Sequence, residues 1–106
     1  MIASTTQIYV TRPFGTIRLL VYIFRVRRQL AKCPGLIKYD FHPGWRTLTI
    51  WENIPALKAF RNSGAHLEAM RSTGKIGRAR TVTWEVTQVP TWPEVIAKLD
   101  GAERRS

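Results

Sequence analysis

The stretch TLTIWENIPALKAFRNSGAHLEAMR, residues 47–71, predicts a strand that runs directly into helical structure. Residues 47–51 are β-branched, aliphatic or aromatic and alternate in character, as the residues of a half-buried strand do. Asn53 then offers a helix N-cap, and Pro55 falls in the first turn, where its missing N–H costs nothing. The junction between strand and helix therefore lies at residues 52–53.

One apolar stripe continues along the predicted helix. Its members recur at spacings of three and four residues and are Leu57, Phe60, Gly64 and Leu67. We expect helical structure to reach Arg71, with a break at residues 62–64. A second short helix then begins near Ser63 and carries His66 in its first turn.

The segments before this stretch predict a strand and a long helix. Residues 7–12 alternate as a strand does, and the helix runs over residues 17–32 with Thr16 as its cap. Its predicted core stripe is Ile17, Leu20, Val21, Phe24 and Ala31. Its apolar surface is wider than that stripe, so the helix is either covered by a second subunit, with a solvated basic end, or rests on an anionic membrane.

The remaining segments predict a hairpin, a last strand and a short helix. Residues 36–42 and 45–52 are strands joined by a Pro-Gly turn, and residues 72–79 form a glycine-rich loop. A strictly alternating strand follows at residues 80–89. Thr91 and Glu94 form a capping box for a helix that ends near Leu99, where Gly101 terminates it before a frayed tail.

This order of elements predicts a single α+β domain over residues 1–106. It is the ferredoxin-like βαββαβ arrangement, with a four-stranded antiparallel sheet and an added C-terminal helix. Two helices cover only one face of such a sheet, yet both faces carry large apolar residues. A second copy of the sheet is the simplest cover for the other face, so we expect a homodimer.

Composition narrows the functional classes. The net charge of +10 permits non-specific contact with nucleic acid, but no base-reading motif accompanies the Lys and Arg residues, so we expect no specific nucleic-acid partner. The single cysteine, Cys33, is most simply a reduced thiol in a cytoplasmic protein. We expect no signal sequence, because residues 1–6 are polar, and residues 17–26 are too short and too charged to span a bilayer.

Three features resemble the antibiotic-biosynthesis monooxygenase family. They are a strand that ends in Trp51-Glu52, a helix with an inward aromatic residue, Phe60, and a Ser-x-x-His turn at residues 63–66. The spheroidene-monooxygenase-like branch is the most similar. The resemblance implies a dimeric α+β barrel with a ferredoxin-like protomer and a pocket between sheet and helices. It also implies a monooxygenase that binds a hydrophobic aromatic or isoprenoid molecule and needs no cofactor.

The titratable and aromatic residues give the candidate site. The histidines lack metal-ligand spacing, so we expect no metal site, and His66 is the candidate catalytic base because its pKa lies near working pH. Trp51 and Phe60 are expected to sandwich a planar substrate. The other candidate substrate-binding residues are Tyr9, Trp45, Trp84 and Met70.

Two alternatives remain open. One is a non-catalytic ligand-binding or regulatory homodimer of the same fold. The other, weaker one is haem binding through His66. Haem-degrading relatives pair a helical Trp with a His ten residues later, and Phe60 and Met70 stand at those positions here, so that catalytic set is not carried over.

Overall fold

The computed structural model describes residues 1–105, with the side chains of all of these except 65 and 102–105. Its elements are β1 (Ile2–Val10), α1 (Gly15–Leu30), β2 (Leu36–His42), β3 (Arg46–Trp51), α2 (Ile54–Arg61), α3 (Gly64–Arg71), α4 (Thr73–Ile76), β4 (Gly77–Glu85) and α5 (Trp92–Arg105). This order confirms the predicted ferredoxin-like arrangement with a C-terminal helix.

The strands form one four-stranded antiparallel sheet in the order β2-β3-β1-β4. β1 is central, and it pairs with β3 on one side and along its whole length with β4 on the other. β2 and β3 form the predicted hairpin, with one irregularity between Leu36 and Lys38. The two crossover connections therefore bring their helices to the same face of the sheet.

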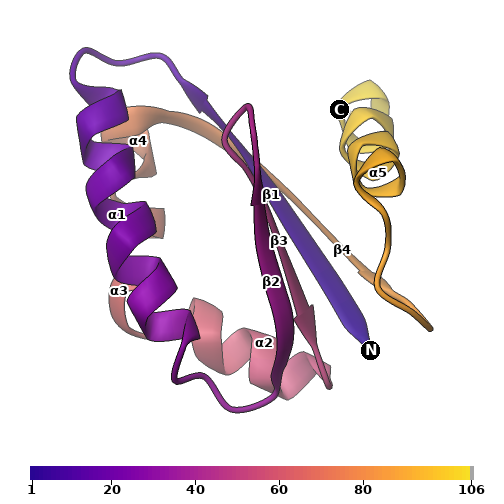
Figure 1. Cartoon of the computed structure of the whole chain (residues 1–106). Helices are drawn as coiled ribbons and strands as arrows, with labels where there is room; N and C mark the ends of the chain where they lie inside the picture. The colour runs from indigo at the N-terminus through magenta and orange to yellow at the C-terminus, as the bar shows by residue number, and fades with distance from the viewer. Residues whose placement is uncertain (106) are drawn as a thin grey trace.

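The sheet separates two layers of helix. α1, α2, α3 and α4 lie on one side, and α5 lies on the other (Figure 1). On the α5 side the buried core consists of Ala3, Leu48, Ile50, Val95 and Leu99. The expectation that this face is left open was therefore wrong for the part under α5, because the chain covers that part with its own last helix.

The strands β1 and β4 differ from their predicted bounds because they pair with each other along the whole length of β1. β1 begins at Ile2 rather than residue 7, and β4 covers residues 77–85 rather than 80–89. The polar Ser and Thr residues at positions 4–6 occupy the central strand because each finds ladder partners on both sides. Gly77 permits this long pairing, because a Cβ there would lie 1.8 Å from the Tyr9 carbonyl oxygen.

The side of α1 that faces the sheet is the opposite of the predicted one. The helix starts at Gly15 after Phe14, and Thr16 does not cap it. Gly15 sits against α4, where a Cβ would lie 2.7 Å from the Ile76 carbonyl oxygen. This close contact turns residues 19, 22, 23, 26 and 30 inward and leaves the predicted core residues exposed. Those exposed residues are Ile17, Leu20, Val21, Phe24 and Ala31.

The later helices follow the sequence closely at their starts. The Asn53 side chain accepts a hydrogen bond from the Ala56 N–H, and the predicted break falls between α2 and α3. Thr91 accepts a hydrogen bond from the Glu94 N–H at 3.5 Å, as the capping box predicts. The predicted stop at Gly101 was wrong, because α5 continues through Gly101 to Arg105. The predicted loop over residues 72–79 likewise contains α4.

Candidate functional site

A cavity of about 410 Å³ lies between the sheet and helices α1 to α4. Its sheet wall presents hydroxyl groups, and its helix wall is mostly apolar. Hydroxyl-bearing residues in the wall include Ser4, Thr6, Thr49 and Thr81, and apolar ones include Leu19, Ile23, Val26 and Leu57. Such a volume, with few polar groups in an apolar wall, is typical of a small-molecule site.

His66 forms part of the cavity wall. Its imidazole lies 4.5 Å from the Phe60 ring, measured between ring centroids, with the two ring planes tilted by 48°, and it also lies against the Arg61 backbone. Its Nδ1 is buried and has no hydrogen-bond partner among the described residues. Burial is the main cause that lowers the pKa of His66 below its ordinary value. A hydrogen bond with the Arg61 backbone raises this pKa, and the positive charge of Arg61 lowers it. The imidazole is therefore neutral near pH 7 and free to accept a proton.

Arg61 brings a half-buried cation to the same wall. Its guanidinium donates hydrogen bonds to the hydroxyl oxygens of Ser4 at 2.9 Å and Thr83 at 2.8 Å. Burial lowers its pKa, but an arginine remains charged at working pH. Sequence reasoning missed this residue because the last turn of α2 shows only an ordinary basic end. The pairing with hydroxyls on β1 and β4 is visible only in the fold.

Gln29 of α1 fixes the loop that presents His66. Its amide nitrogen donates to the Ser63 carbonyl oxygen at 3.0 Å, and its amide oxygen accepts from the His66 N–H at 2.9 Å. Ser63 precedes α3 but makes no side-chain cap, since its hydroxyl donates instead to the Ala59 carbonyl oxygen. The Gln29 side chain of α1 therefore caps α3, because it accepts the hydrogen bond from an N–H in the first turn of α3. No local sequence signal could have identified it.

Trp51 lies behind the cavity wall. The residue is fully buried, its Nε1 donates to the Thr49 hydroxyl at 2.8 Å, and its ring lies 5.1 Å from the Phe60 ring. The two rings contact each other, so they do not sandwich a ligand as predicted. Phe60 does line the cavity, as does Met70. Trp51 instead supports Phe60, which in turn supports His66.

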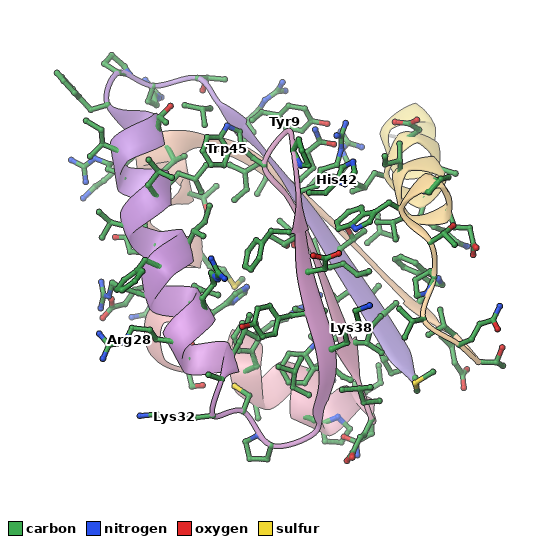
Figure 2. All side chains as sticks on the ribbon, viewed as in Figure 1. Tyr9, Arg28, Lys32, Lys38, His42 and Trp45 are labelled. Atoms are coloured by element: carbon green, nitrogen blue, oxygen red, sulfur yellow. The ribbon has the colours of Figure 1, made fainter. Side chains whose placement is uncertain are left out.

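The other predicted aromatic residues lie away from this cavity. Trp84 packs in the core under α5, and Tyr9 carries the Arg78 guanidinium over its ring. Trp45 lies at the β2–β3 turn (Figure 2), where it lines a shallow surface pocket. Tyr9, Trp45 and Trp84 therefore do not line the cavity that His66 lines, because strand alternation and the turn direct them elsewhere.

The described residues contain no group of three or more His, Cys, Asp or Glu side chains that could hold a metal ion. His42 stacks at 4.4 Å on Trp92 of α5 and so lies on the far side of the sheet from His66. Cys33 is half-buried, and burial raises the pKa of its thiol. Asp40 is also in the cavity lining, but its carboxylate accepts a hydrogen bond from the Trp92 Nε1 of α5 at 2.9 Å. The cavity chemistry thus rests on one imidazole, one guanidinium and several hydroxyl groups.

No family sequence model matches the chain, and no curated protein matches it in sequence. Solved structures do match its fold. A variant of SnoaB, a cofactor-independent oxygenase from Streptomyces nogalater, matches with a TM-score of 0.68 at 10% identity, over 83% of this chain and 94% of that one. The chain shares the fold of antibiotic biosynthesis monooxygenase structures.

Two further structures extend this comparison. A dimeric ferredoxin-like protein of unknown function from a Jannaschia species gives a TM-score of 0.73 at 15% identity, over 80% of this chain and 98% of that one. A Nitrosomonas europaea protein named for the antibiotic biosynthesis monooxygenases gives 0.67 at 10% identity, over 83% and 100%. At such low identity these likenesses show the fold alone.

Proposed function

We propose that this protein is a monooxygenase-like enzyme that oxidises a hydrophobic aromatic molecule with dioxygen and no cofactor. One observation carries the proposal: a neutral imidazole, His66, stands in the wall of a largely apolar cavity beside the cation Arg61. Proton abstraction from a phenol or enol needs a base whose pKa lies near the working pH, and a cation that stabilises the resulting anion. The fold similarity to a cofactor-independent oxygenase supports the same class of reaction.

The reaction consumes one substrate and one dioxygen. His66 takes a proton from the electron-rich substrate, and Arg61 stabilises the resulting anion. The carbanion form adds dioxygen to give a peroxide, which takes a proton from the His66 imidazolium. Loss of water from this hydroperoxide removes the hydrogen that the attacked ring carbon still carries and converts that carbon to C=O, so one oxygen atom enters the product and the other leaves as water. The apolar wall limits the access of water to these intermediates.

The cavity limits the substrate class. Its volume of about 410 Å³ and its polar sheet wall suit a planar molecule with a few hydroxyl or carbonyl groups along one edge. An isoprenoid is the second ligand class, and the resemblance to the spheroidene-monooxygenase-like branch would favour it. Tyr22 and Met70, which stand in the wall, suit either class by apolar contact.

Oxygen uptake tests the proposal. We expect purified protein to consume dioxygen with a naphthol or hydroxyanthracene, and His66→Gln to abolish this at unchanged folding. His42→Gln is the matched control, because His42 lies on the other side of the sheet, and it should keep full activity. Equal loss in both variants, or equal activity in both, would refute the role of His66 as base.

Ligand binding without oxygen uptake would instead support the non-catalytic alternative. In that case the naphthol should bind to the cavity, its affinity should fall on substitution of His66, and no product should form. A haem absorption band that disappears in His66→Ala would support the haem-binding alternative.

Two further parts of the proposal concern assembly and compartment. We propose a homodimer through the sheet face that carries α5, as one of the similar structures is dimeric. A monomeric mass by light scattering at micromolar concentration would contradict it. We also propose a cytoplasmic location, which the free thiol of Cys33 supports.

A further inference from the structure

The outer side of α1 is an exposed apolar surface. Its residues, with their exposed fractions, are Phe14 (77%), Ile17 (62%), Leu20 (52%), Val21 (53%) and Phe24 (64%). We call these five residues the α1 outer face. They recur at helical spacing, so they form one stripe, while the opposite side of the same helix lines the cavity. An exposed contiguous apolar stripe of this kind marks an interaction surface.

The charges around the α1 outer face are mostly positive, although Arg25 of α1 is ion-paired with Glu68 of α3. The first 39 residues contain no Asp or Glu, and α1 itself carries four arginines. The Arg28 guanidinium lies 5.9 Å from the centre of the Phe24 ring, and Arg28 and Lys32 project away from the sheet (Figure 2). Arg18 is exposed and lies next to Ile17 of the stripe. An apolar stripe edged mainly by cations complements an anionic, apolar surface.

Phe14 gives a second indication. It is the most exposed large apolar residue of the chain's described part and has φ of 60°, in the left-handed region. A bulky residue is strained there, and Gly or Asn would serve the turn better. The backbone thus holds an aromatic ring out at the end of the stripe at an energetic cost, which a contact in the bound state would offset.

A second copy of the chain does not suit this surface. α1 lies on the opposite side of the sheet from α5, so the proposed sheet-face dimer leaves the α1 outer face uncovered (Figure 1). Packing two such faces together would bring arginines of like charge into contact. None of the helices in residues 1–105 combines the length and the apolar character that crossing a membrane requires. A helix of this kind lies along a membrane surface instead.

We propose that the α1 outer face binds the surface of an anionic membrane, with α1 in the plane of the headgroups. Phe14, Leu20 and Phe24 insert among the upper acyl chains, and Arg18, Arg28 and Lys32 contact lipid phosphates. This inference does not depend on the proposed oxygenase activity. It concerns the outside of α1, whereas that activity concerns the cavity on its inside.

Vesicle co-sedimentation of the full chain tests the proposal. The two probes are vesicles of phosphatidylcholine with phosphatidylglycerol and vesicles of phosphatidylcholine alone. Wild-type protein should bind the anionic vesicles far more strongly, and added salt should weaken the binding. The double variant Leu20→Asp/Phe24→Asp should reduce partition by roughly ten-fold or more, because it removes two inserted side chains. Arg28→Glu should reduce it by roughly five-fold or more.

Matched controls separate this face from general basicity. Val89→Asp introduces one carboxylate at another exposed apolar residue, and Lys58→Glu reverses a charge on α2 as Arg28→Glu does on α1. Both should bind vesicles nearly as well as the wild type. The proposal is overturned if wild type binds both vesicle types equally, or if the controls lose as much binding as the variants of the face. It is also overturned if the double variant changes the oligomeric mass but not the vesicle binding, which would make the face a protein interface.

The two proposals fail separately. With a water-soluble phenol, the variants of the α1 outer face should keep the oxygen uptake of the wild type, because no changed residue lines the cavity. Retained uptake also shows that these variants are folded. Conversely, His66→Gln should leave vesicle binding unchanged.

Discussion

Replacing Gln29 by Ala should detach α1 from the junction between α2 and α3. The Gln29 amide makes two short hydrogen bonds there, 3.0 Å to the Ser63 carbonyl oxygen and 2.9 Å from the His66 N–H. Two longer ones reach the Phe60 carbonyl oxygen at 3.3 Å and the Ser63 hydroxyl at 3.4 Å. The variant keeps the backbone of α1 intact, so its effect should be confined to the junction and to the imidazole that the junction presents.

The size of the effect follows from those contacts. Each short hydrogen bond contributes about 0.5–1.5 kcal/mol net, and the two longer ones contribute little, so the loss should be about 2 kcal/mol. For a chain of this length that corresponds to a fall in Tm of roughly 8–12 °C. The His66 N–H also loses the partner that replaces a cap, so its hydrogen exchange should accelerate by roughly thirty-fold.

Urea unfolding and native-state hydrogen exchange measure the two effects. Gln88→Ala is the matched control, because Gln88 is exposed in the segment after β4 and should change neither quantity. If Gln29→Ala unfolds like the wild type and the His66 amide exchanges at its normal rate, Gln29 does not hold the junction. The account of how the fold positions His66 would then be wrong.

Three other perturbations test the packing and the electrostatics. Trp51→Ala should cost about 3–5 kcal/mol in urea unfolding, because it empties a fully buried site behind the cavity wall. Burial lowers the pKa of His66 below its ordinary value of 6.5, so the unfolded chain binds a proton more readily than the folded one. The free energy of unfolding of the wild type should therefore fall relative to that of His66→Gln as the pH falls below 6.5. Equal pH profiles of the two proteins would contradict this. Gly77→Ala should cost roughly 2 kcal/mol or more, because its Cβ would meet the Tyr9 carbonyl oxygen, whereas Gly74→Ala, with open space around it, should not destabilise the protein.

The parts of the fold that local chemistry determines could be predicted from sequence. The Asn53 cap, the strand β2 and the break before α3 follow from neighbouring residues, and the structure has each of them where predicted. Thr91 and Glu94 mark the start of α5 for the same reason. The order of these elements was enough to give the ferredoxin-like sheet.

Long-range contacts determine what could not be predicted. α1 is apolar on both sides, so its pattern alone could not say which side faces the sheet; the contact of Gly15 with α4 decides it. The polar start of β1 is a strand only because β3 and β4 flank it. Arg61 and Gln29 matter through partners more than 20 residues away, on other elements.

The central claim is that the cavity beside His66 holds the ligand. The chain has two histidines, so nitrogen-15 NMR of histidine-labelled protein reports on each separately. Titration with a naphthol should shift the His66 imidazole resonances in a saturable way and leave those of His42, which stacks on α5, unchanged. A naphthol that binds without moving the His66 signals, or that moves those of His42 instead, would contradict the account.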